Sequence, residues 1–201
     1  MSKNLLLEIG TEEMPANIMS GVVDQLRVLA ENAFGENRIS LKEITVYATP
    51  RRLAVLVKEA ADRQPDEEVK KRGPSIKAAF DEDGNPTRAA QVFARGQHID
   101  PSELIREGEY TWAHVVNEGK KIEDILPSLF TSLITGLNFT RSMRWADEEA
   151  RFIRPIRWIV ALCGSEVVPM EFAHVKSGRI SRGHRFLCKE DVTIESPENY
   201  K

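Results

Sequence analysis

Cysteine is scarce in this chain, with only Cys163 and Cys188 among 201 residues. Two cysteines cannot form the disulfide network that holds many small secreted domains together. They also lack the CxxC spacing and the clustered histidines of a zinc site. We therefore expect both to be ordinary, half-buried thiols.

Long apolar segments are also missing. No run approaches the roughly 18 residues needed to cross a bilayer, and the opening MSKNLLLEIGTEE meets acidic residues directly after its short apolar stretch. We therefore expect neither a membrane span nor a signal peptide. These features predict a cytoplasmic protein without a membrane partner.

Familiar catalytic and metal-binding motifs are absent as well. The sequence contains no Walker A loop, GxGxxG, HExxH or GxSxG. An acidic stretch at 81–85 resembles the beginning of a calcium loop, but its glycine comes two positions early and Val92 stands where a chelating acid is needed. The histidines are scattered, so a hydrolase with a histidine–carboxylate site is the weakest of the hypotheses. No catalytic residue and no metal ligand is predicted.

The apolar content is sufficient for one large core or two small ones, since 41% of the residues are hydrophobic. Strands, hairpins and amphipathic helices alternate without a regular βαβ rhythm. This pattern predicts an α+β fold of small antiparallel or mixed sheets with packed helices and more than one sub-core.

Residues 1–62 are predicted to form a β-α-β-β layer. The apolar run LLLEI favours a buried strand, and a helix should follow between Pro15 and Gly35. Two further strands are expected to form a hairpin that is closed by a Pro-Arg-Arg turn at 50–52. The apolar residues expected to be buried by the helix are Val22, Leu26, Leu29 and Ala33.

Residues 63–75 are predicted to be a polar connection because charged residues dominate them. A second α+β region, possibly comprising two units, is expected over 76–201. Its predicted elements are a helix between Thr87 and Gly96, a hairpin strand over 110–116 turning at 117–119, a helix over 125–137, and strands over 156–163 and 166–175.

The segment 138–158 alternates arginines with phenylalanine and tryptophan. A guanidinium can contact phosphate while a neighbouring ring stacks on an unpaired base, so this composition is compatible with an RNA surface. The same arginines could instead stack on their own aromatic neighbours and pair with the acids at 147–149, which would brace the fold. Composition alone leaves both interpretations open.

A second basic segment runs from Lys176 to Lys189, where five bases occur before any acid. Two glycines within it favour a loop that could follow a phosphate backbone. The turn after Pro50 is expected to project its arginines off the sheet edge, because burial would leave too many donors unpaired. The candidate RNA-binding residues are Arg51, Arg52, Arg144, Arg154, Arg157, Arg179, Arg182 and Arg185.

Five ordered motifs span nearly the whole chain. They are LLLEIGTEEMPA at 5–16, ATPRRLAVLV at 48–57, KRGPSIKAAFDEDGNPTRAAQVFARGQ at 71–97, SMRWADEEARFIRPIRWIVAL at 142–162 and SGRISRGHRF at 177–186. Together these motifs closely resemble the N-terminal part of the beta subunit of bacterial glycyl-tRNA synthetase.

The resemblance implies a heterotetramer of two alpha and two beta subunits that joins glycine to tRNA-Gly with ATP and releases AMP and diphosphate. In that family the alpha subunit carries the class II active site, so ATP and magnesium are expected there and no cofactor is expected in this chain. The chain is expected to be an N-terminal fragment, inactive alone, that contributes to tRNA binding and subunit architecture and does not bind DNA. The alternative is a purely structural scaffold, or a domain that docks the alpha subunit, without direct tRNA contact.

Overall fold

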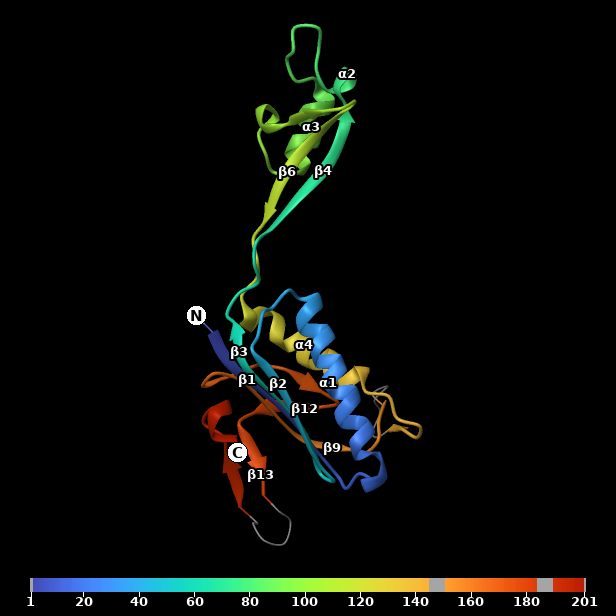
Figure 1. The fold of residues 1–201 in the computed structure, drawn as a ribbon, viewed down its shortest axis with the longest axis vertical. Coiled ribbons are helices and arrows are strands. Elements are labelled where there is room, and N and C mark those ends of the chain that lie inside the picture. Colours follow the sequence, from blue (N-terminus) through green and yellow to red (C-terminus); the bar gives the residue numbers. More distant parts are fainter. Residues whose placement is uncertain (1, 145–150, 184–189, 201) are drawn as a thin grey trace. The chain divides into compact units, whose positions relative to one another are not determined.

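The computed structural model describes residues 2–144, 151–183 and 190–200, and it divides into two compact units. The first, here called the sheet unit, comprises Met1–Gln64 and Lys120–Lys201, and the second, here called the inserted module, comprises Pro65–Gly119. Figure 1 shows the elements of both. The predicted α+β class is confirmed, because helices pack on several separate sheets.

A mixed sheet organises the sheet unit, and its described strands follow the order β11-β12-β9-β1-β3-β2, with β10 paired to β9. Strand β1 is antiparallel to both β3 and β9, whereas β12 is parallel to β9. The strands are β1 (Ser2–Thr11), β2 (Glu43–Thr49), β3 (Arg52–Ala61), β9 (Ile156–Cys163), β10 (Glu166–Val167), β11 (Glu171–Phe172) and β12 (Val175–Gly178). Strand β1 has neighbours on both sides and layers on both faces, which explains why the run LLLEI is apolar apart from Glu8, as expected for the predicted buried strand.

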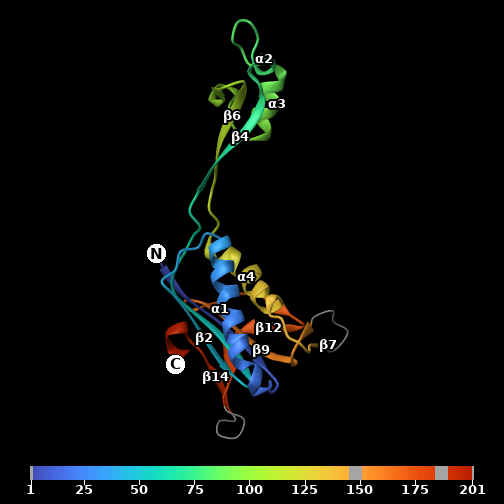
Figure 2. The same ribbon diagram turned by 45° about the vertical axis from the view of Figure 1, so that its right-hand side comes forward.

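Two helices cover one face of this sheet: α1 (Met19–Glu36), which follows the short 3-10 helix η1 (Ala16–Ile18), and α4 (Ile122–Gly136) (Figures 1 and 2). Both helices pack on Leu5, Leu7 and Ile9 of β1 in the main hydrophobic core. Helix α4 confirms the helix predicted over 125–137.

The buried face of α1 is partly as predicted. Its fully buried residues are Val22, Leu26, Ala30 and Phe34, which follow one another at four-residue spacing. Leu29 and Ala33 lie at the margin of this face and are half-buried. Leu29 packs against α4 at Gly136, where an added Cβ would come within 2.9 Å of a Leu29 methyl group.

The predicted β2–β3 hairpin is confirmed, whereas the strand expected over 166–175 is broken into β10, β11 and the first residue of β12. Only its β10 part forms a hairpin with β9, because β12 runs parallel to β9. Strands β2 and β3 pair in register from Glu43 opposite Lys58 to Thr49 opposite Arg52, and the chain turns at Pro50 and Arg51. Strands β9 and β10 meet at a turn in which Gly164 has a φ of 58°, a left-handed conformation that glycine adopts without steric cost.

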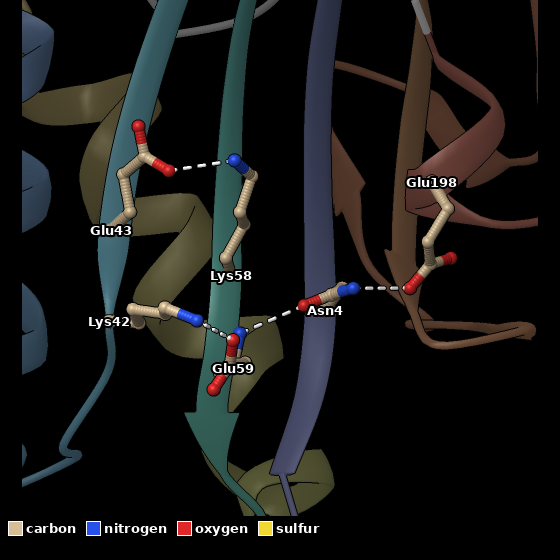
Figure 3. Close-up of polar contacts among 6 residues, drawn as sticks. All are labelled: Asn4, Lys42, Glu43, Lys58, Glu59 and Glu198. Atoms are coloured by element: carbon tan, nitrogen blue, oxygen red, sulfur yellow. Dashed lines mark hydrogen bonds and ion pairs between the residues drawn. The ribbon is translucent and has the colours of Figure 1, made fainter.

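A bulge at the amino-terminal end of β1 is held by the side chain of Asn4 (Figure 3). Glu59 of β3 has a left-handed φ of 50°, and its backbone N–H donates to Asn4 Oδ1 at 2.8 Å. The Asn4 amide nitrogen in turn donates to Glu198, and Lys42 pairs with the Glu59 carboxylate. Lys58 pairs with Glu43 across β2 and β3 at 2.7 Å. Asn4 therefore satisfies the irregular backbone and links the sheet to the end of the described chain.

The other face of the sheet carries a second layer. It consists of the strand pair β13 (Ile180–Arg182) and β14 (Asp191–Thr193) and the 3-10 helix η3 (Pro197–Tyr200). A smaller pair, β7 (Met143–Arg144) and β8 (Arg151–Phe152), completes the unit. Under the second layer lies a second core of Leu6, Ala54, Leu56, Trp158, Val160, Leu162 and Ile194. The strict alternation of β1 therefore sends Leu6 and Glu8 to this layer and their neighbours to the helices.

The inserted module has a core of its own. A three-stranded sheet in the order β4-β6-β5 packs against short helices around Ala79, Ala90, Ala94, Leu104 and Ala113. Its elements are β4 (Glu67–Ser75), α2 (Ile76–Ala79), α3 (Arg88–Gly96), η2 (Pro101–Glu103), β5 (Ile105–Glu107) and β6 (Tyr110–Asn117). Helix α3 confirms the predicted short helix after Thr87, although the Thr87 hydroxyl donates to the Ala78 carbonyl at 2.6 Å and does not cap the helix.

The unit boundaries differ from the predicted divisions at 62 and 75. Most of the charged stretch 63–75 is the edge strand β4, because an edge strand can hold charged side chains in solvent while its backbone pairs on one side only. The region 76–201 is divided: 76–119 completes the module, and 120–201 returns to place β9 beside β1. Strand β6 accordingly pairs back with β4 and β5 and does not form a hairpin with the residues that follow it.

Membrane insertion by a helix finds no support in the described ranges, where no helix has both the length and the apolar character that crossing requires.

Replacing Leu26 with Asp should unfold the sheet unit, because an unpaired charge in an apolar core costs several kcal/mol. Val28→Asp is the matched control, since Val28 lies on the same helix with 53% of its surface exposed. Thermal unfolding followed by circular dichroism measures both. A Leu26→Asp chain as stable as the Val28→Asp chain would contradict the assigned packing face.

Candidate nucleic-acid interface

Glu8 is a fully buried carboxylate in the middle of β1, and it points into the second core. Trp158 Nε1 and Ser181 Oγ each donate to Glu8 Oε1 at 2.5 Å. The Tyr200 hydroxyl donates to Oε2 at 2.5 Å, and Arg52 Nη1 lies 3.5 Å from the same oxygen. We call these five residues the Glu8 cluster. Four donors from four different elements satisfy one buried charge.

The backbone around the cluster is shaped to admit the tryptophan ring. Trp158 on β9 lies opposite Gly10 of β1. A Cβ at Gly10 would lie 1.9 Å from the Trp158 ring, so no larger residue fits there without moving the ring. Burial, with the adjacent Glu8 carboxylate, raises the pKa of Tyr200 far above its usual value, so the hydroxyl remains a donor at neutral pH.

Beside this cluster, a groove with a basic lining runs along β9, β12 and β13. Among the residues that the structure describes, four bases and one acid, Asp191, line it. The bases are Arg157, Lys176, Arg179 and Arg182, and the ring of Trp158 and the half-exposed side chain of Ile180 lie among them. The described lining therefore combines positive charge with the apolar side chain of Ile180 and the edge of the largely buried Trp158.

The groove arginines make only surface ion pairs. Arg157 Nε lies 3.2 Å from Glu12, and 53% of the arginine side chain is exposed. Arg182 Nε lies 3.9 Å from Asp191, and half of that arginine side chain is exposed. Such solvated pairs stabilise a fold by about 0–1 kcal/mol, so exchanging the carboxylate for another anion costs little.

Arg179 is more firmly placed than the other two. Its Nη2 donates to the Ser165 carbonyl at 2.9 Å, while Nη1 lies 3.5 Å from Glu195. The guanidinium is thus oriented by the backbone and keeps further donors for a ligand.

Arg51 and Arg52 do not project off the sheet edge as predicted. Both are half-buried, and Arg52 turns toward Glu8 while donating to the Arg182 backbone carbonyl. The Arg51 guanidinium lies 6.0 Å from the centroid of the Trp158 ring, and the Arg182 guanidinium lies 5.5 Å from it. The predicted direction was wrong because the buried Glu8 and the Trp158 ring supply partners for these arginines. Both partners are distant in the sequence, so the turn residues alone do not indicate them.

Arg144 and Arg154 do not line the groove. Arg154 donates to the backbone carbonyls of Glu13 and Ile153, both at 3.0 Å, and so braces the chain before β9. Arg144 is exposed at the end of β7. Arg185 lies outside the described residues, as does Cys188. The structure therefore brings together three of the eight candidates, Arg157, Arg179 and Arg182, and places Arg51 and Arg52 beside them.

Metal or nucleophile chemistry gains no support from the described side chains. Among them, no three His, Cys, Asp or Glu residues cluster as a metal would require. Burial raises the pKa of the Cys163 thiol to about 11, so this thiol stays protonated and unreactive near neutral pH.

One member of the Glu8 cluster can be recognised from the sequence alone. Glu8 is an acid inside an otherwise apolar strand, and a buried acid must have partners. Ser181 and Tyr200, which supply two of those partners, carry no local pattern that marks them, because they meet Glu8 only through the fold.

Replacing Glu8 with Gln should destabilise the chain by about 2–4 kcal/mol, because the amide cannot accept from all the buried donors that now share the carboxylate. Glu12→Gln is the control, since Glu12 forms only an exposed pair with Arg157. Urea unfolding gives both free energies. Equal stability of the two variants would show that the Glu8 cluster does not hold the second layer.

Comparisons with known proteins converge on one family. The family model described as "Glycyl-tRNA synthetase beta subunit" matches residues 5–201. The protein named "Glycine--tRNA ligase beta subunit" from Desulfitobacterium hafniense is 50% identical over 205 residues, covering 100% of this chain and 30% of that protein. The proteins of the same name from Natranaerobius thermophilus and Halothermothrix orenii are 46% and 42% identical, again over 100% of this chain and over 30% and 29% of their own lengths.

The chain thus spans about 30% of the length of the curated relatives it matches. The match runs through every element described above, from β1 to η3. It also bears out the resemblance carried by the five sequence motifs. The chain belongs to the glycyl-tRNA synthetase beta subunit family.

Proposed function

We propose that this chain is the N-terminal region of a glycine–tRNA ligase beta subunit and that its basic groove contacts tRNA-Gly. The complete enzyme would pair two beta with two alpha subunits in the cytoplasm and join glycine to tRNA at the expense of ATP, which yields AMP and diphosphate. The observation that carries the tRNA contact is the groove whose described lining contains Arg157, Lys176, Arg179 and Arg182 and one acid.

The groove suits a phosphate backbone because its cations are available and separate. Arg157 and Arg182 face acids only across exposed pairs, so a phosphate can replace those acids at small cost. Each phosphate that is neutralised releases condensed counterions, which adds a salt-dependent driving force. Guanidinium groups also offer the forked donors that phosphate oxygens accept.

The groove is held in shape before any ligand arrives. The Arg182 guanidinium on β13 lies near the Trp158 ring. Strand β13 pairs with β14, where Arg182 lies opposite Asp191. Ser181, the neighbour of Arg182, is bonded to buried Glu8. Because the strand and the ring are fixed, less conformational freedom is lost on binding.

The catalytic chemistry is assigned to the alpha subunit in this proposal. The described residues supply no cluster suited to a metal ion, and the basic groove offers solvated arginines in place of a closed nucleotide pocket. ATP and magnesium would bind in the alpha subunit, and the present chain alone would be inactive. Its contribution would be tRNA contact and subunit architecture.

The scaffold alternative has its own supporting observation. Arg51, Arg52 and Arg154 are engaged by Trp158, by Glu8 and by backbone carbonyls, so they brace the fold. The alternative extends this role to the groove arginines and assigns the surface to subunit docking. The difference lies in exposure for two of the three groove arginines, since 53% of the Arg157 side chain and 50% of the Arg182 side chain are exposed, against 26% for Arg52. Arg179, at 33%, lies closer to Arg52.

Replacing Arg157, Arg179 or Arg182 with Ala in the complete alpha–beta enzyme should raise KM for tRNA and leave KM for glycine unchanged. Each substitution should also reduce the slope of log affinity against log salt by about one unit, because one phosphate contact is lost. Aminoacylation kinetics and tRNA binding across a salt series measure these two effects. Arg27→Ala is the control, since Arg27 is exposed on α1, the layer on the opposite face of the sheet.

The scaffold alternative predicts a different result for the same variants. Loss of thermal stability or of alpha-subunit binding, with KM for tRNA and the salt slope unchanged, would contradict the proposed tRNA contact.

A further inference from the structure

The sheet of the inserted module has one covered and one open face. Thr111 and Ala113 of β6 are buried on the face where α2 and α3 pack. Their neighbours Tyr110, Trp112 and His114 alternate to the opposite face, where the described residues of the module provide no covering layer. The exposed fraction of Ile105 (42%) and of Val116 (57%) marks this face as open.

The open face carries flat rings in one row and cations in the next. Tyr110, Trp112 and His114 follow one another along β6 at two-residue spacing, about 7 Å apart. In β4, Arg72 lies opposite Trp112 and Lys70 lies opposite His114. Opposed residues of an antiparallel pair share a face, so the two rows stand side by side.

The rings and cations are fixed by contacts with one another. The Arg72 guanidinium lies 3.6 Å from the centroid of the Tyr110 ring, and Lys70 Nζ lies 5.0 Å from that of Trp112. Trp112 Nε1 donates to the Glu107 carbonyl at 3.3 Å, which sets the direction of the indole. The arrangement is thus formed without a ligand.

The charges on this face differ from those of the groove. Lys70 is ion-paired with Glu107, so its charge is balanced. Arg72 is exposed and forms no ion pair within the described part of the chain, so its forked donors point to solvent beside a ring. Glu68, opposite Val116, is a second acid on this face, so the face carries two bases and two acids beside a row of stacking surfaces.

We propose that this open face binds unpaired RNA nucleotides, whose bases stack on Tyr110, Trp112 and His114 while Arg72 contacts a phosphate. Rows of aromatic side chains on an open antiparallel sheet are a recurring solution for single-stranded nucleic acid, because every base has a face that can stack. Stacking would supply most of the affinity here, since the charges are nearly balanced. This surface belongs to the inserted module and the basic groove to the sheet unit, so the proposal goes beyond the function proposed for the groove.

The test uses the chain of residues 1–201 and a fluorescently labelled oligoadenylate of about ten nucleotides, a length within the range that one such platform covers. Anisotropy titrations should show that Trp112→Ala weakens binding about five- to a hundredfold, the range for losing one stacked base. Trp112→Phe should retain most of the affinity because it keeps a ring. Arg72→Ala should weaken binding and lower the salt slope by about one unit.

Arg95→Ala is the matched control for Arg72→Ala, because Arg95 is exposed on α3, on the covered side of the sheet. The Arg95→Ala chain should bind the oligonucleotide as tightly as the parent chain does. A second control is a duplex RNA of equal length, whose affinity should not change with Trp112→Ala. Groove variants such as Arg179→Ala leave the rings of the open face intact. Trp112→Ala should therefore reduce the affinity for oligoadenylate by the same factor in the parent chain and in the Arg179→Ala chain. The two proposals therefore fail independently.

Three outcomes would overturn this proposal. The parent chain could fail to bind the oligoadenylate, or Trp112→Ala could bind it as tightly as the parent. Sedimentation could also show that Trp112→Ala alters self-association while RNA affinity stays the same, which would assign the face to a protein contact.

Discussion

The buried carboxylate of Glu8 is the interaction on which the second layer of the sheet unit depends. Taking an isolated charge out of water costs several kcal/mol, and that cost is offset only when good donors surround the charge. Here the indole of Trp158, two hydroxyls and the Arg52 guanidinium surround it. Those donors come from β9, β13, η3 and β3, so the charge on β1 fixes how four other elements meet.

The basic groove is a consequence of that arrangement. Ser181 is drawn inward to Glu8, and strand alternation then turns its neighbour Arg182 outward beside Trp158. The same constraint explains why the arginines have different environments. Arg52 reaches Glu8 and braces the fold, whereas 53% of the Arg157 side chain and 50% of the Arg182 side chain stay exposed. Arg179 lies between these cases, because it donates to the Ser165 carbonyl and is 33% exposed. The buried carboxylate thus accounts for the inward direction of Arg52 and for the outward position of Arg182.

Local sequence patterns predicted the elements better than their assembly. Helix α4 and the β2–β3 hairpin follow from periodicity and turn residues within a few positions, so both were predictable. The pairing of β1 with β9 joins residues about 150 positions apart, such as Glu8 and Trp158, and no local pattern encodes it. For the same reason the composition identified Arg179 and Arg182 as candidates but could not show that Arg51 and Arg52 turn inward.

The most direct test of this account asks whether Glu8 acts on tRNA binding through the groove. A double-mutant cycle combines Glu8→Gln with Arg182→Ala in the complete enzyme and measures tRNA affinity for all four proteins at one salt concentration. If the Glu8 cluster positions Arg182, the two effects should be coupled by about 0.5–3 kcal/mol, as expected for residues in one network. Strict additivity, within about 0.3–0.5 kcal/mol, would contradict the account, because it would show that the buried charge and the groove act separately.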